Sequence, residues 1–137
     1  HTPRDGPHAW PSRAPAVAAM LRAVRPDLLG LQEVLAGQLA DLRAALPAYH
    51  AVGVGRDGGR DAGEFAPVLF LRRKFELVSQ RTLWLSETPD VPGSRGWGAA
   101  CVRIAQLCML RNRFDGRQIF VCNTHLDHVS AEARRQG

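Results

Sequence analysis

The stretch LLGLQEV, residues 28–34, joins a short apolar run directly to a carboxylate. Residues 28–31 are apolar on both faces and too few for a helix, which predicts a short buried strand. Glu33 follows the end of this strand, and strand ends are where α/β proteins bind their ligands. A carboxylate there is costly to desolvate unless it is paired or binds a metal. Taken alone, Glu33 is better explained as the first solvated residue after the strand.

A second apolar run, FVCNTHLDH at residues 120–128, ends in a dense group of polar side chains. Four of them can ligate, hydrogen-bond or titrate: Asn123, His125, Asp127 and His128. Histidine titrates near neutral pH and can act as a general acid or base. A zinc-hydrolase motif of the HxHxDH type is a competing interpretation, but its leading histidine would fall at position 123, which is asparagine. If both strand ends belong to one site, Glu33 and His125 are neighbours in space.

Two further charged residues are candidates for the same site. Glu64 is a lone acid at the entry to the apolar run FAPVLF, where an exposed strand start is the ordinary explanation. It gains functional meaning if it reaches His125, because a carboxylate partner fixes the tautomer of a histidine and raises its basicity. Arg103 could reach a phosphate group, although a solvated strand position explains it more simply.

Helical and strand patterns alternate around these stretches. Apolar residues recur with helical spacing over residues 12–25 and 35–46, and each of these predicted helices is followed by a proline. Residues 56–63 and 86–98 have the glycine and proline content of loops. A final helix is expected after Ser130, a good N-cap residue. Further strands are expected at 49–54, 65–71, 76–85, 99–111 and 118–124, the last two joined by a hairpin at Asp115-Gly116. This order indicates a mixed α/β or α+β architecture.

The composition, with 45% hydrophobic and 23% charged residues, is that of a globular protein, and no apolar stretch is long enough to cross a bilayer. The net charge of +5 is compatible with a phosphate-ester substrate, but the arginines are scattered and do not by themselves indicate nucleic-acid binding. The three cysteines form no metal-binding spacing and are interpreted as buried apolar residues. The first residues include neither an initiating Met nor a signal-peptide core, so the cellular compartment is left open.

Taken in order, these segments resemble the endonuclease/exonuclease/phosphatase superfamily of deoxyribonuclease-I-like phosphoesterases. The resemblance spans nearly the whole chain and rests on LQEV and NTHLDH in this order, with GEFAPVLF between them. The piece TLWLSETPDVPGSRGWGAACVRI, residues 82–104, is similar to the substrate-facing loop and returning strand of a bacterial subgroup. The implied fold is a four-layer α/β/β/α sandwich. Residues 1–137 would form a single incomplete domain of it, without the first strand and the C-terminal half.

The resemblance also implies a role for each candidate residue. Glu33 is expected to bind Mg²⁺ or Mn²⁺, and His125 is expected to be catalytic with Glu64 as its partner. Asn123 and Arg103 are expected to contact the substrate. Asp127 and His128 are expected either to hold the loop structure or to contact the residues that form the site.

The expected function is metal-dependent hydrolysis of phosphate esters in the intact protein, of a phosphodiesterase or nuclease kind, with the fragment inactive. The expected partner is a phosphate-ester substrate, with nucleic acid as one option, and no protein partner is expected. Two alternatives remain open because a fold does not choose its substrate. One is a phosphoesterase acting on small molecules or lipids, and the other is a catalytically inactive binding module.

Overall fold

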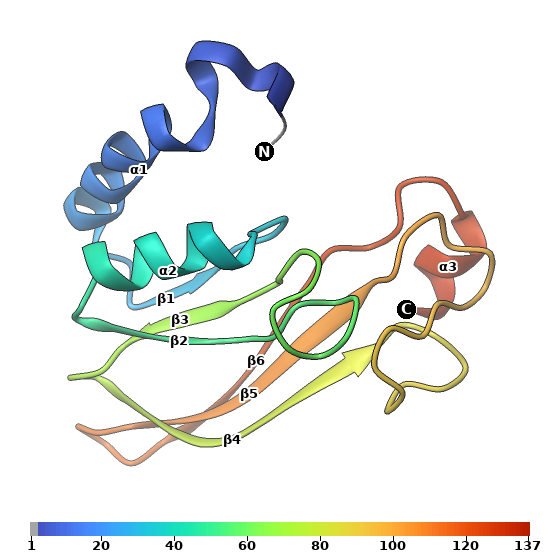
Figure 1. Ribbon diagram of the computed structural model, residues 1–137. Helices are drawn as coiled ribbons and strands as arrows, with labels where there is room; N and C mark the ends of the chain where they lie inside the picture. The colour runs from blue at the N-terminus through green and yellow to red at the C-terminus, as the bar shows by residue number, and fades with distance from the viewer. Residues whose placement is uncertain (1–2) are drawn as a thin grey trace.

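Two three-stranded antiparallel sheets stack on each other, and two helices cover the free face of the first (Figure 1). The computed structural model describes residues 3–137. Its helical elements are η1 (Pro3–His8), α1 (Trp10–Val24), α2 (Ala36–Ala45) and α3 (Ala131–Gln136). Its strands are β1 (Leu28–Gly30), β2 (Tyr49–Val52), β3 (Val68–Leu71), β4 (Phe75–Trp84), β5 (Ile104–Asn112) and β6 (Gln118–Thr124).

The two sheets differ in how their strands are connected. The first has the order β1-β3-β2, so that β3 pairs with β1 on one side, with Leu28 opposite Phe70, and with β2 on the other. The second has the order β4-β5-β6 and is a meander of sequential neighbours. Its β5–β6 turn contains Gly116 at φ 73°, which confirms the hairpin predicted from Asp115-Gly116.

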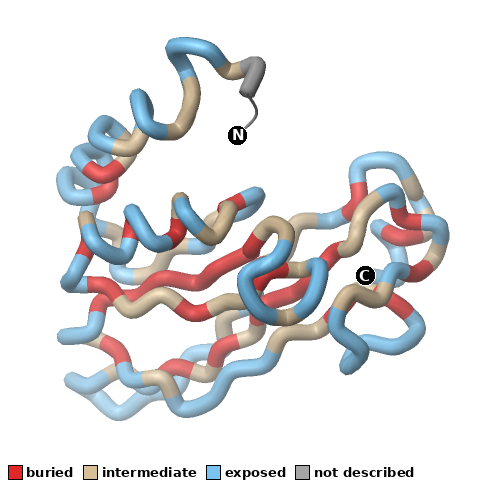
Figure 2. Tube along the Cα trace, viewed as in Figure 1, coloured by how far each residue is buried: buried red, intermediate tan, exposed pale blue. Residues whose placement is uncertain are grey.

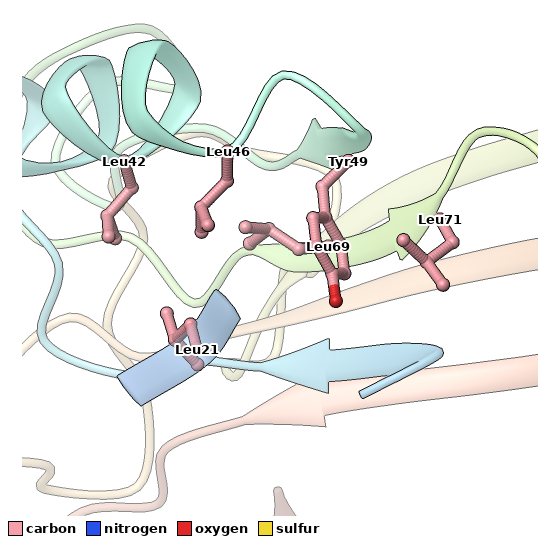
Figure 3. Packing of buried hydrophobic residues seen from close by; sticks show 6 residues of the cluster. All are labelled: Leu21, Leu42, Leu46, Tyr49, Leu69 and Leu71. Atoms are coloured by element: carbon pink, nitrogen blue, oxygen red, sulfur yellow. The ribbon is translucent and has the colours of Figure 1, made fainter. Parts of the chain in front are cut away.

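The central strand β3 is buried on both faces, as Figure 2 shows. Because side chains alternate along a strand, Leu69 and Leu71 face the helices while Val68 and Phe70 face the second sheet. Figure 3 shows the first of these layers, in which side chains from both helices meet Leu69. It is formed by Leu21, Leu42, Leu46, Tyr49, Leu69 and Leu71. The second layer is formed by Val52, Val68, Phe70, Phe75, Cys108 and Leu110.

These elements account for three of the four expected layers among the described residues. On the second sheet, Phe120 pairs with Met109, on the face opposite to the buried Cys108 and Leu110. Phe120 is 60% exposed there. Cys122 lies on the same face, two residues along the edge strand β6, and is exposed. The expectation that all three cysteines are buried was therefore wrong for Cys122.

Most element boundaries agree with the sequence patterns, and the exceptions have local causes. The strand expected at 65–71 begins only at Val68, because Pro67 has no N–H to donate to a neighbouring strand. The strand expected at 99–111 begins at Ile104, and the residues before it belong to the long loop after β4. Ser130 caps α3 as predicted, since its Oγ accepts a hydrogen bond from the Ala133 amide. No described helix has the length and apolar character needed to span a bilayer.

Candidate active site

The ends of β1 and β6 and the segment before β3 meet at one edge of the sheets (Figure 1). Residues from these segments line a small pocket there. Three residues expected to act together, Glu33, Glu64 and His125, line this pocket. Two arginines, Arg56 and Arg103, line it as well. Its remaining walls are the apolar residues Phe65, Ala66, Val102 and Ile104.

Glu33 lies at a bend in the backbone just after β1. Its φ angle is 57°, in the left-handed region that residues other than glycine rarely adopt. On its C-terminal side, Val34 exchanges two backbone hydrogen bonds with Phe65, which holds the bend against the segment before β3. The Glu33 side chain is 65% exposed. The bend therefore presents an accessible carboxylate at the pocket, at the cost of local backbone strain.

His125 follows β6 and reaches the same place from the second sheet. Its Nε2 atom lies 3.0 Å from Oε1 of Glu33. Next to it, the Thr124 hydroxyl donates a hydrogen bond to the Ile104 carbonyl and fixes the end of β6 against β5. The structure therefore brings Glu33 and His125 together, as the two strand ends predicted.

Asn123 joins the two sheets directly behind this pair. Its Nδ2 donates to the carbonyl oxygens of Leu31 (2.7 Å) and Pro67 (2.9 Å). Its Oδ1 accepts a hydrogen bond of 2.6 Å from Nε2 of Gln32. Gly30 leaves room for this amide, because a Cβ atom there would lie 2.8 Å from Asn123 Oδ1. Both amide hydrogens are used within the scaffold, so Asn123 positions the strand ends.

Glu64 has a different partner from the one expected. Its carboxylate forms an ion pair and hydrogen bond with Nη1 of Arg56, and no hydrogen bond of the described residues joins it to His125. The loop between β2 and β3 explains this pairing. The Arg56 amide donates to the Glu64 carbonyl, which places the two side chains opposite each other. Gly55 permits this tight turn, since a Cβ atom there would lie 2.2 Å from the Ala62 carbonyl oxygen.

Arg56 was not identified from the sequence. It lies in a glycine-rich segment without periodicity, and its meaning depends on the folding of that loop. The Trp84 indole nitrogen donates a hydrogen bond of 2.6 Å to the Arg56 carbonyl, so the end of β4 also holds this residue. The available signal was the basic residue eight positions before Glu64, which becomes informative only once the loop is known to return on itself.

Arg103 is buried, with only 6% of its side chain exposed, so the simpler interpretation as a solvated strand residue was wrong. Its Nη2 lies 3.2 Å from Nδ1 of His128. Its Nε lies 3.8 Å from Oδ2 of Asp127, which is an ion pair without a hydrogen bond. Asp127 and His128 thus both contact Arg103, which lines the pocket.

Asp127 connects the long loop after β4 to the loop after β6. Its Oδ1 accepts from the amides of Val129 and Ser130, and its Oδ2 accepts from those of Ala100 and Cys101. The amide of Ser130, followed by the other three, holds the pKa of this carboxyl well below its usual value, although burial acts in the opposite direction. Asp127 is therefore a fixed negative charge beside the Arg103 guanidinium.

The donor set of the pocket can be compared with what a divalent cation requires. Among the described residues, no group of three or more His, Cys, Asp or Glu side chains is arranged to hold a metal ion. Mg²⁺ needs fewer protein ligands than that, because it keeps several waters and binds one or two carboxylates together with substrate oxygens. Glu33 offers an exposed carboxylate at the pocket, so the residues present fit a Mg²⁺ site to which this chain contributes one ligand.

Comparison with known proteins gave one match to a family model. The model of the Endonuclease/Exonuclease/phosphatase family matches residues 5–136. A comparison with curated proteins gave no match.

Solved structures resemble the chain over almost its whole length. An endonuclease/exonuclease/phosphatase from Bacteroides vulgatus is 44% identical, with a TM-score of 0.97 over 98% of this chain and 52% of that one. A mannosyl-6-phosphatase from Bacteroides thetaiotaomicron is 37% identical, with a TM-score of 0.94 over 98% of this chain and 51% of that one. TDP2 from D. rerio, complexed with a single-strand DNA product, is 17% identical and shares the fold (TM-score 0.67, 88% and 41% covered). The chain thus spans about half the length of the more similar structures.

Proposed function

The chain belongs to the endonuclease/exonuclease/phosphatase family, and from this membership we propose that the protein hydrolyses phosphate esters with the help of Mg²⁺ or Mn²⁺. The observation that carries the proposal is the 3.0 Å approach of His125 to Glu33 in a pocket that two arginines also line. A carboxylate, an imidazole and two guanidinium groups are the side chains that phosphoryl transfer uses to bind charge and move protons.

Glu33 is the residue we assign to the metal. A hard cation prefers carboxylate and phosphate oxygens, and the Glu33 carboxylate is accessible at the pocket. When bound, such an ion polarises the phosphoryl group and stabilises charge on the leaving oxygen. The strained backbone at Glu33 supports this assignment, since strain of this kind is concentrated at functional sites.

His125 is the residue we assign to proton transfer or to stabilising the phosphoryl oxygens in the transition state. Its Nε2 faces Glu33, so the imidazole is held at the place where a phosphate would meet the metal ligand. Glu64 remains in the proposal as a catalytic carboxylate of the same pocket, with Arg56 as its observed partner.

Four further residues complete the assignment. Arg103 is proposed to attract the substrate phosphate, with Asp127 and His128 holding its guanidinium from behind. Asn123 is proposed to act on the substrate only indirectly, by fixing the strand ends that carry Glu33 and His125.

A small-molecule phosphate ester is the substrate that the comparisons favour over nucleic acid. The mannosyl-6-phosphatase is 37% identical to the chain, whereas the DNA-binding TDP2 is 17% identical and supports the fold alone. The second and more specific form of the proposal is therefore that the substrate is a sugar phosphate.

The test is phosphate release by the protein that carries these residues, measured with sugar phosphates, a lipid phosphodiester and single-stranded DNA in parallel. Hydrolysis of at least one substrate that requires added Mg²⁺ or Mn²⁺ and stops with EDTA is the expected result. Cleavage of DNA alone would identify the protein as a nuclease and not as an enzyme of small phosphate esters. Binding of the substrates without turnover under either metal would identify an inactive binding module and overturn the proposal.

A further inference from the structure

Two arginines line the candidate site, Arg103 buried and Arg56 largely shielded from solvent. Arg56 comes from the loop between β2 and β3 and has 17% of its side chain exposed. Arg103 comes from the residue just before β5 and has 6% exposed. The Nε atom of each is buried and has no hydrogen-bond partner among the described residues. Buried donors are nearly always satisfied in folded proteins, whereas each of these Nε atoms has only a carboxylate 3.8 Å away, so both guanidinium groups have donors that the described residues leave unused.

The contacts of Arg56 leave most of its donors free. A guanidinium has five N–H groups, and the hydrogen bond to Glu64 uses one of them, on Nη1. Asp57 approaches Nε to 3.8 Å, which is an ion pair without a hydrogen bond. The Trp84 indole holds the Arg56 backbone and not its side chain. Glu64 and Trp84 therefore fix the position of Arg56, while no described residue accepts a hydrogen bond from its Nη2 atom, which leaves that end of the guanidinium for a ligand.

The ligand that matches such a pair of arginines is a terminal phosphate. A phosphate monoester carries close to two negative charges at neutral pH and three non-bridging oxygens. A diester carries one charge and has two such oxygens. Arginine binds phosphate through two parallel N–H groups, so two arginines together suit the monoester better than the diester.

We propose that Arg56 binds the non-bridging oxygens of a terminal phosphate and, together with Arg103 of the same pocket, makes the pocket select phosphate monoesters over diesters. This inference rests on the proposed phosphoesterase function and deepens it by naming the substrate class. Glu64 is then the residue that positions Arg56. Arg56 acts on specificity by direct contact with the substrate, and no step of the reaction is assigned to it.

The experiment compares 4-nitrophenyl phosphate with bis(4-nitrophenyl) phosphate as substrates of the protein that carries this chain. The measured quantity is the ratio of kcat/KM for the monoester to kcat/KM for the diester. The wild-type ratio is expected to exceed one. In Arg56→Gln the ratio is expected to fall roughly tenfold or more, mainly through the KM of the monoester, because charge-assisted hydrogen bonds to the dianion are lost. The ratio in Arg56→Lys is expected to lie between those of the wild type and Arg56→Gln, since lysine keeps the charge and loses the bidentate geometry.

Arg60→Gln is the matched control. Arg60 lies in the same loop and is exposed, so the variant removes the same charge without touching the pocket and should keep the wild-type ratio. Competitive inhibition by inorganic phosphate gives a second measurement, which is expected to weaken in Arg56→Gln and to remain in Arg60→Gln.

The outcomes separate this inference from the function on which it rests. If the wild-type protein hydrolyses neither substrate, the proposed phosphoesterase function is wrong. A wild-type protein that prefers the diester keeps the function and overturns the role of Arg56. An equal loss on both substrates in Arg56→Gln would show that Arg56 only holds Glu64 in place. If Arg56→Gln fails to fold, the proposal is still tested by the wild-type preference and by the monoester-to-diester ratio of kcat/KM in Arg56→Lys.

Discussion

The side-chain nitrogen of Asn123, on the second sheet, lies 2.9 Å from the carbonyl oxygen of Pro67, at the entry to the central strand of the first. The same nitrogen also donates to Leu31, just after β1. One buried amide therefore fixes three chain segments that are far apart in sequence. These hydrogen bonds also set the positions of the candidate catalytic residues, because Glu33 lies two residues after Leu31 and His125 two residues after Asn123.

Asn123→Leu is expected to reduce the free energy of unfolding by roughly 2–4 kcal/mol, because it removes three hydrogen bonds and leaves buried carbonyl groups unsatisfied. Urea unfolding of the two proteins measures the difference. Asn112→Ala, which removes one exposed hydrogen bond in the β5–β6 turn, is the control and should cost about 1 kcal/mol or less. Equal stability of Asn123→Leu and the wild type would contradict the conclusion that the Asn123 side chain holds these segments together.

Glu33→Gly is expected to abolish metal-dependent hydrolysis and at the same time to raise the free energy of unfolding by up to about 1 kcal/mol. The first effect follows from loss of the metal ligand. The second follows because glycine adopts the left-handed conformation at φ 57° without strain. Glu33→Ala should lose the activity without the gain in stability. Turnover by either variant at the wild-type rate would remove Glu33 from the site.

His125→Ala is expected to lower kcat by roughly 10²-fold or more, the usual contribution of a general acid or base. Stability should change little, because the imidazole is 37% exposed and its contact with Glu33 lies at the surface of the pocket. Thermal melting and steady-state kinetics on the same preparation test both statements. A variant that melts at a lower temperature while keeping the wild-type rate would identify His125 as a structural residue.

Asp127 predicts the shape of the acid stability curve. Its folded-state pKa lies below the ordinary carboxyl value of about 4, so the unfolded chain binds the proton more readily than the folded one. The stabilisation is complete above the unfolded-state pKa and is lost as the pH falls below it. Melting temperatures measured from pH 6 down to pH 2 should therefore fall less steeply in Asp127→Asn than in the wild type. Parallel curves for the two proteins would show that the backbone contacts of Asp127 are dispensable.

The sequence predicted the parts of the site that depend on local patterns. Glu33 and His125 were found because each follows an apolar run that was interpreted as a strand. Since strand ends meet at the edges of a sheet, the two residues were expected to be neighbours. Arg56 could not be found in this way, because a glycine-rich loop has no periodicity and only the folded loop brings Arg56 next to Glu64. The burial of Arg103 was missed for a similar reason, since Asp127, about 24 residues further along, compensates its charge.

The strand order of the first sheet has a consequence for the path of folding. The β4-β5-β6 meander is closed by the loop at residues 85–103 and by the short β5–β6 turn. Leu28 of β1 instead pairs with Phe70 of β3, across a longer stretch that covers most of the N-terminal half of the chain. Because closing a long loop costs more entropy before any contact compensates for it, the meander is expected to form first and β1 to join last. The segment that carries Glu33 would then gain protection from hydrogen exchange only in the final stage, after the strand that carries His125 is already in place.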